Sequence, residues 1–311
     1  MKILKLLFLN RNVILILGVV AGLVWGKGAV WTESLIFPAL ALVMTIATMG
    51  IESGVLRSVR GILGPACIGI AMNYLVLSGV IILLSKYLIT DRNLQAGFIL
   101  IAAVPPAVAV IPFSFLLRGN NTFSLLGTLG GYLGALVIMP LMAIAFFGTS
   151  FVSPLRLIII MAELILLPLA AGRFLNWTGI DKRFEYMKGP ITNWSFSLIT
   201  YTIVGLNQDM FLHRPLSLVP TALIVVASTF ILGWLIEIVC KKLLRIPAET
   251  VTSLILLGTL KNYGIAGGLA LALFGKEVAS PSTVSAVFMI IYIMWLEWKL
   301  HRGEPQKGLA H

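Results

Sequence analysis

The sequence predicts an all-α polytopic membrane protein with ten transmembrane helices, arranged as an inverted repeat of five and five. Three observations lead to this fold class. Of the 311 residues, 59% are hydrophobic and 11% are charged, whereas soluble domains contain about 25% charged residues. Hydropathy separates the chain into ten apolar segments joined by short loops. The fourth and the ninth of these segments are interrupted at matching positions of the two halves.

Most of the apolar segments are long enough to cross a bilayer as a helix. The start of the chain, MKILKLLFLN, is basic and then apolar like a signal peptide, but all later segments are membrane spans too. We therefore interpret it as leading into the first helix. The chain is expected to form one membrane domain, 1–311, with a tail at 298–311. The predicted spans are 12–30, 35–50, 62–88, 94–117, 122–147, 153–175, 191–210, 216–240, 250–274 and 281–297.

The basic residues are distributed unevenly between the two sides of the membrane. Ten spans place both termini on one side, where 16 of the 23 lysines and arginines fall, against 6 on the other side, with Lys261 left over. Cytoplasmic loops carry an excess of Lys and Arg, so we expect both termini in the cytoplasm and the protein in the plasma (inner) membrane. The same rule accounts for the net charge of +11, and a nucleic-acid partner is not expected.

The two halves of the chain also resemble each other. TIATMGIES, which ends span 2, aligns with YTIVGLNQD, which ends span 7, and Gly50 then lies opposite Gly205. FSFLLRGNN in span 4 aligns with LALALFGKE in span 9, and Gly119 then lies opposite Gly275. Two halves of five spans each have opposite topologies, which is the inverted repeat of secondary transporters. The predicted repeats cover about 12–147 and 153–297.

The ninth span, VTSLILLGTLKNYGIAGGLALALFG, carries a polar break at its centre. Lys261 at the middle of a bilayer costs about 2.5–3.5 kcal/mol, so it needs a partner or a water-filled cavity. Asn262, Tyr263 and Gly264 follow it and weaken the helix. A polar break between two apolar half-helices is typical of a discontinuous transport helix. The alternative is a lysine near a helix end whose amine extends to the headgroups.

The fourth span, GFILIAAVPPAVAVIPFSFLLRG, is interrupted by Pro105, Pro106 and Pro112. Each proline removes a backbone donor and disfavours helix in the preceding residue. A proline kink in an ordinary bundle is the alternative interpretation. Broken helices at matching positions of inverted halves predict a binding site at the middle of the membrane. The N-termini of the half-helices would favour an anion there.

These two segments resemble motifs of the bile acid:sodium symporter family, in a superfamily that also includes arsenite carriers. VPPAVAVIPFSFLLRGNNTFSLLGT and LGTLKNYGIAGGLALALFG are similar to family patterns of approximately CPGGTASNxxxxxAKGxxxxSxxxT and ETGxQNxGxA. The resemblance covers essentially the whole membrane region. It implies a panel domain of spans 1, 2, 6 and 7 and a core domain of spans 3–5 and 8–10, in which spans 4 and 9 cross at their breaks.

The sodium ligands that the resemblance implies carry over incompletely. The family's Ser-Asn pair on span 4 falls on Val110 and Ile111. The glutamate and glutamine of span 9 fall on Leu257 and Lys261. Polar side chains are retained at four positions of the resemblance: Asn73, Ser124, Thr128 and Asn262. Asn262 matches a family position that is implicated in substrate contact.

We hypothesise that Lys261 replaces the coupling ion, because an ammonium can donate to Ser124, Thr128, Asn73 or freed carbonyls. Lys261 would be a permanent internal cation or a proton carrier. Proton-coupled transport or uniport is therefore favoured over sodium coupling. Glu163, in the middle of span 6, is a second candidate proton site, with a helix-packing or oligomer contact as the alternative.

The main functional hypothesis is a secondary transporter of an organic, anionic solute by alternating access. Asn262, Lys261, Tyr263, Val108 and Ile111 are the candidate substrate-binding residues, the last three forming an apolar wall. No catalytic residue, metal or cofactor is expected, and the partners are the solute and the bilayer, with a homo-oligomer left open. The alternatives are a sodium-coupled symporter of bile-acid-like or other organic anions, an arsenite-type effluxer, and a sensor that does not transport.

Overall fold

The computed structural model describes residues 10–49, 59–148, 154–179, 183–213 and 215–302. Three parts of the predictions therefore lie outside the described residues: Gly50 of the repeat alignment, the first residue of the predicted span 6, and residues 303–311 of the predicted tail. Within the described ranges the chain is helical and has no β-strand. The all-α class is thereby confirmed for this part of the chain.

Five of the described helical stretches are long and apolar enough to cross a membrane, and the shortest has 24 residues. A helix of about 20 apolar residues spans the hydrocarbon core of a bilayer. These lengths are consistent with a polytopic membrane protein, whereas the ten-span arrangement stays a prediction. The five stretches are Gly26–Met49, Gly61–Leu88, Asn121–Phe147, Val219–Leu243 and Lys276–Leu300.

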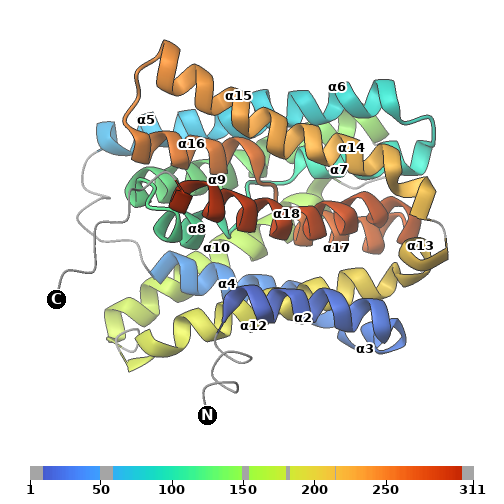
Figure 1. Ribbon diagram of the computed structural model, residues 1–311. Coiled ribbons are helices and arrows are strands. Elements are labelled where there is room, and N and C mark those ends of the chain that lie inside the picture. Colours follow the sequence, from blue (N-terminus) through green and yellow to red (C-terminus); the bar gives the residue numbers. More distant parts are fainter. Residues whose placement is uncertain (1–9, 50–58, 149–153, 180–182, 214, 303–311) are drawn as a thin grey trace.

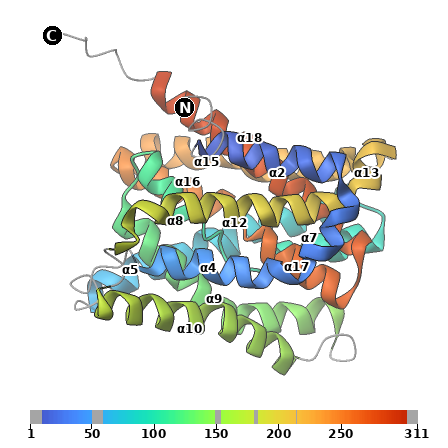
Figure 2. The ribbon, with the colours of Figure 1, turned by 90° about the horizontal axis from the view of Figure 1, so that it is seen from below.

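Four helices pack side by side as one layer, which we call the four-helix layer: α2 (Arg11–Val24), α4 (Ile36–Met49), α10 (Pro154–Thr178) and α12 (Glu185–Leu206). Helix α12 contacts α2 on one side and α4 on the other, and α4 contacts α10. Figure 2 shows α10, α4, α12 and α2 next to one another in this order. In Figure 1 α2, α4 and α12 lie along the lower edge of the molecule.

The first helix is shorter than the predicted span 12–30. Asn10 caps α2 by accepting from the backbone N–H groups of Asn12 and Val13, and α2 ends at Val24. A 3-10 turn and short helices then lead into α4: η1 (Gly26–Gly28), α3 (Ala29–Thr32) and η2 (Glu33–Leu35).

The other helices form a second group, above the layer in Figure 1. In this group α5 (Val59–Ile70) and α6 (Ser78–Leu88) are joined by the π-helical η4 (Ala71–Leu77) into one continuous rod. A second rod has the same construction, with two π-helical segments: α14 (Val219–Val226), η6 (Ala227–Ile231), α15 (Leu232–Ile238) and η7 (Val239–Leu243). The remaining members are α7 (Arg92–Ala103), α8 (Val110–Leu116), α9 (Asn121–Phe147), α16 (Ala248–Thr259), α17 (Tyr263–Leu273) and α18 (Lys276–Arg302). Helix α13 (Gln208–His213) and the 3-10 turn η5 (Pro215–Leu218) connect the layer to the second rod.

Glycines bring α5 and α9 into backbone contact. A Cβ built on Gly69 of α5 would lie 2.3 Å from the carbonyl oxygen of Gly127 in α9, and a Cβ on Gly130 would lie 2.6 Å from the Cα of Ala66. Small residues allow membrane helices to approach this closely.

We predict that Gly69→Ala destabilises the protein, because its new methyl group meets backbone rather than a movable side chain. Overpacking of this kind costs about 1–3 kcal/mol. The matched control is Gly79→Ala on the same rod, where a Cβ meets nothing within 4 Å. The melting temperature of the purified protein in detergent should fall for Gly69→Ala and stay the same or rise for Gly79→Ala. Equal melting temperatures for the two variants would contradict the packing argument.

Candidate functional site

The first helix break lies between α7 and α8. Helix α7 ends at Ala103 and α8 begins at Val110, so that Pro105 and Pro106 lie in the non-helical connection, where their missing N–H groups interrupt no helical hydrogen bond. Pro112 is not part of this break, contrary to prediction. It lies in the first turn of α8, where a proline is tolerated because the N–H groups there have no partner within the helix.

The second break lies between α16 and α17, at residues 260–262. Leu260 is extended, and the side chain of Asn262 accepts from the N–H of Ile265 at 3.1 Å, which caps α17. Gly264 also lies outside the break that it was predicted to form, as the second residue of α17. Its lack of a side chain serves packing there, since a Cβ would lie 3.2 Å from Leu40 and 3.3 Å from Ile199 of the four-helix layer.

The two breaks pair with each other. The N–H of Ala107 donates to the carbonyl of Leu260 at 3.2 Å, and the N–H of Asn262 donates to the carbonyl of Pro105 at 3.0 Å. Pro106 and Lys261 face each other in an isolated antiparallel bridge. Backbone groups buried in a membrane protein need such partners because no lipid group can supply them. We call this paired region the crossover.

Lys261 is fully buried at the crossover. Its Nζ donates to Oδ1 of Asn73 at 2.6 Å and to the carbonyls of Ala102 and Val104 at 2.8 and 2.9 Å. It also lies 4.4 Å from the ring centre of Tyr74. An ammonium group has three donors, and the three acceptors match them. No carboxylate pairs with Lys261 in the part of the chain that the structure describes.

The acceptors of Lys261 belong to two elements that both need a donor at this place. The carbonyls of Ala102 and Val104 lie at the C-terminal end of α7, where the last carbonyls of a helix have no intrahelical partner and carry the negative end of its dipole. Asn73 belongs to the π-helical segment η4, and its amide nitrogen donates to the carbonyls of Leu257 and Leu260 at 3.3 and 3.4 Å. Lys261 and Asn73 together connect both breaks to the first rod.

A small cavity of about 30 Å³ lies between the crossover and the four-helix layer. This volume suffices for one or two water molecules. Asn262 faces this region and donates to the hydroxyl of Tyr132 at 2.7 Å. Ile111, predicted as part of the apolar wall, does not line the cavity. The lining includes Ala107, Val108, Ala109, Lys261, Asn262, Tyr263, Gly264, Leu40, Phe196, Ile199, Thr200, Ile203, Ala286 and Met289.

A family model, described as the Sodium Bile acid symporter family, matches residues 37–214. The matched part is more than half of the chain and contains the first break. The chain belongs to the sodium bile acid symporter family. The second break and Lys261 lie beyond the matched residues. Together with the long apolar helices, the family shows an integral membrane protein.

The names of the family and of two relatives are those of transporters, and none of these names is that of an enzyme. The probable sodium/metabolite cotransporter BASS1, chloroplastic, of Arabidopsis thaliana is 25% identical over 224 residues, which cover 70% of this chain and 55% of that protein. The sodium-dependent transporter YocS of Bacillus subtilis (strain 168) is 23% identical over 232 residues, which cover 71% of this chain and 68% of that protein. The chain thus spans about half the length of the Arabidopsis relative.

Ser124 and Thr128, the hydroxyl groups that the resemblance to the family motif retains, make no hydrogen bond with Lys261. Ser124 donates to Oγ of Ser114 at 2.8 Å, and the hydroxyl of Thr128 is buried without a hydrogen-bond partner among the described residues. Lys261 donates to Asn73 and to carbonyls at the end of α7, which are two of the alternatives predicted for it, and its three N–H groups leave none for Ser124 or Thr128. Ser114 was not predicted, since a single hydroxyl within PFSFLL forms no recognisable pattern.

Apolar side chains occupy the positions for which the resemblance to the family motif implies polar ones. Val110 and Leu257 are fully buried, and a Cδ atom of Leu257 lies 2.6 Å from where a Cβ of Gly127 would be. Leu257 therefore packs directly against the backbone of α9, one residue before Thr128. Ile111 is half-buried.

Glu163 does not belong to this site. Its side chain is exposed on α10, which packs on α4 and α9 and is the outermost helix of the four-helix layer in Figure 2. Its role, as a second proton site or as a helix-packing or oligomer contact, stays a prediction.

We predict that Lys261→Met lowers the melting temperature of the purified protein. The change removes the donor to Oδ1 of Asn73 and to the carbonyl of Val104, whereas the carbonyl of Ala102 still accepts from Ser78. A buried polar group left unsatisfied costs about 1–3 kcal/mol. The gain from no longer burying an amine offsets part of this loss. Lys242→Met is the matched control, because Lys242 is exposed and surface changes usually stay within about 0.5 kcal/mol. A Lys261→Met protein that is as stable as the control would contradict this interpretation.

Proposed function

We propose that the protein is a secondary transporter that moves an organic anion by alternating access, with Lys261 in the place of the coupling ion. The observation that carries this proposal is the hydrogen bonding of Lys261. A buried ammonium with three oxygen acceptors supplies a positive charge to the crossover without an ion from solution.

The loss of sodium coupling is supported by the side chains around the crossover. Sodium needs several oxygen ligands around it, and Val110 and Leu257 put hydrocarbon at motif positions where the family has polar groups. Ser124 and Thr128 remain, but the side chain of Ser124 is directed to Ser114. We therefore propose proton coupling or uniport, with Lys261 as proton carrier or as permanent cation.

The proposed inverted repeat is supported by equivalent features that recur along the chain. Helices α7 and α16 begin 156 positions apart, at Arg92 and Ala248. The π-helical segments η4 and η6 also begin 156 positions apart, at Ala71 and Ala227. Helices α9 and α18, the last of each half, have 27 residues each. We propose ten spans, with repeats at about 12–147 and 153–297.

We propose that the four-helix layer is the panel, formed by spans 1, 2, 6 and 7, and that the second group of helices is the core, formed by spans 3–5 and 8–10. In this arrangement the crossover belongs to the core, and the cavity beside it lies at the boundary with the panel. Movement of the core against the panel would expose this cavity to one side of the membrane and then to the other. The excess of basic residues supports cytoplasmic termini in a plasma membrane.

An anionic solute is supported by the charge and the helix end at the cavity. Lys261 and the N-terminus of α17, capped by Asn262, both line it, and a helix N-terminus favours negative charge. Val108 and Tyr263 line the same cavity, which supports an apolar body on the solute. We propose that Asn262, beside the hydroxyl of Tyr132, contacts the polar part of the solute.

A sodium-coupled symporter is the second candidate, because both relatives are named for sodium. The buried hydroxyl of Thr128, unpartnered within the described ranges, also favours it as a remaining oxygen ligand. The two candidates differ in whether sodium binds.

We predict that sodium chloride does not raise the melting temperature of the purified wild-type protein above its value in choline chloride. A ligand present at 100 times its Kd stabilises the state that binds it by about 2.7 kcal/mol, so a sodium site would be visible without knowing the solute. The Bacillus subtilis relative, which is named as sodium-dependent, is measured in parallel for comparison. A sodium-dependent rise in this protein would mean that the sodium site persists.

The second arm of the measurement compares wild type with Lys261→Gln from acidic to alkaline pH. If Lys261 releases its proton within this pH range, the folded protein binds fewer protons than the unfolded chain, in which a lysine stays protonated. The wild type should then gain stability as pH rises, because stability increases with pH wherever the unfolded state binds more protons. Lys261→Gln should lack this gain. Stability that is independent of pH in both proteins would assign Lys261 as a permanent cation and rule out the proton carrier.

A further inference from the structure

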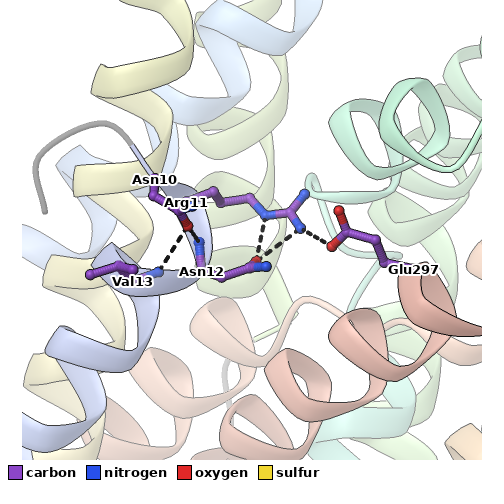
Figure 3. A network of polar contacts seen from close by, with 5 residues as sticks. All are labelled: Asn10, Arg11, Asn12, Val13 and Glu297. Carbon is purple, nitrogen blue, oxygen red and sulfur yellow. Dashed lines mark hydrogen bonds and ion pairs between the residues drawn. The ribbon is translucent and has the colours of Figure 1, made fainter. Parts of the chain in front are cut away.

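A second cation lies at one end of the boundary between the four-helix layer and the other helices. Arg11 is the first residue of α2, and its Nη2 lies 3.0 Å from Oε2 of Glu297 in α18. Nε and Nη2 also donate to Oδ1 of Asn12 at 3.2 and 3.0 Å. Figure 3 shows the guanidinium group reaching across the space between α2 and α18 to meet Glu297.

Arg11 also contacts α8, the half-helix that follows the first break. Its guanidinium carbon lies 5.1 Å from the ring centre of Phe113. Arg11 belongs to the layer, whereas Phe113 and Glu297 belong to the second group of helices. The side chains of Arg11 and Glu297 are 19% and 26% exposed. The pair is therefore partly accessible to water and lies where the two groups of helices must separate if they move against each other.

A cavity of about 40 Å³ lies directly behind Arg11. It shares Ala109, Phe196, Thr200 and Met289 with the cavity at the crossover. The two cavities are therefore neighbours along one boundary, with Arg11 at the outer end and Lys261 at the inner end. Polar and apolar residues line the outer one: Arg11, Thr192, Asn193 and Thr200, with Leu15, Ala109, Pro112, Phe113, Phe196, Met289 and Ile290.

The chemistry of this outer cavity suits a carboxylate with a small apolar body. Guanidinium can bind a carboxylate with two parallel hydrogen bonds, and Arg11 contacts Glu297 through Nη2. Phe113, Phe196 and Met289 provide apolar surface next to it. Glu297 is itself a carboxylate, so it occupies Arg11 in the way that an anionic solute would.

We propose that Arg11 is an anion-binding residue on the path to the crossover, and that Glu297 is an internal carboxylate that occupies it while the path is closed. An incoming organic carboxylate replaces Glu297 on Arg11, which releases the contact between α2 and α18 and lets the outer cavity widen. This inference rests on the proposed transport of an organic anion and adds a second binding position to it.

The test measures charge selectivity at the outer cavity and needs no knowledge of the solute. Asn193, which lines this cavity, is replaced by cysteine in full-length protein that carries Cys67→Ser, since Cys67 is exposed and Cys240 is buried. The probes are a negatively charged and a positively charged methanethiosulfonate reagent. The measured quantity is the ratio of their labelling rates at position 193.

We expect Glu297→Gln to raise the ratio of negative to positive labelling by about tenfold, within the range that a local charge imposes on association rates, because Arg11 then lacks its internal carboxylate. Arg11→Gln should lower the ratio below that of wild type. Arg11→Lys should retain the preference for the negative reagent, which keeps the test valid if Arg11→Gln fails to fold.

Matched controls come from a neighbouring ion pair that does not line this cavity. Lys299 pairs with Glu237 between α18 and α15, and neither residue lines the outer cavity. Lys299→Gln and Glu237→Gln change the same charges as the test variants and should leave the ratio unchanged.

Two results would overturn the proposal. If Glu297→Gln and Arg11→Gln each raise the labelling rates of the negative and the positive reagent by the same factor, the ion pair only holds α2 and α18 together. If neither variant changes the ratio, Arg11 does not attract anions to the cavity. Both results are independent of transport, so a failure here is distinguishable from a failure of the sodium and pH measurements at Lys261.

Discussion

The need to satisfy backbone groups at two interrupted helices is the constraint on which this structure depends. A broken helix inside a membrane exposes carbonyl and N–H groups that lipid cannot satisfy. Here the two breaks solve the problem jointly, by pairing Ala107 with Leu260 and Asn262 with Pro105. The carbonyls of Ala102 and Val104 at the end of α7 accept hydrogen bonds from Lys261. The first break therefore relies on a side chain from the second, and the positions of α8, α17 and the cavity beside them follow from this contact.

A tethered lysine and a bound sodium ion can both place a positive charge among oxygen atoms, but they make different demands on the surroundings. Sodium requires oxygen ligands on all sides, whereas an ammonium uses three directed hydrogen bonds and tolerates hydrocarbon elsewhere. The lysine has its three acceptors, while Leu257 packs hydrocarbon against α9 beside Thr128. The buried hydroxyl of Thr128, for which no partner is found in the described chain, is the cost of this arrangement, about 1–3 kcal/mol for one unsatisfied group.

The helical class and the broken segments could be predicted from sequence because Pro105, Pro106 and Lys261 stand out within long apolar runs. Asn73 could be named as a candidate partner of Lys261 only through the resemblance to the family, which has a polar residue at the matching position of span 3. The failures at Pro112 and Gly264 arose because both residue types also suit the first turn of a helix or a close packing contact. Ser124 and Thr128 could not be separated from Asn73 as partners of Lys261, because helix rotation is set by packing between distant segments. The pair of Arg11 and Glu297 joins positions 286 apart, and no local pattern connects them.

The two roles proposed for Lys261 have opposite consequences for the direction of transport. If the lysine is a permanent cation, the solute crosses as a monoanion without a compensating ion, and each cycle moves one negative charge. A membrane potential that is negative inside then drives the anion outward, by about 2.3 kcal/mol per 100 mV. If Lys261 instead takes up a proton with the solute and releases it on the other side, the cycle is electroneutral and the proton gradient can drive uptake. The protonation of one buried amine would then determine whether this fold exports or accumulates its solute.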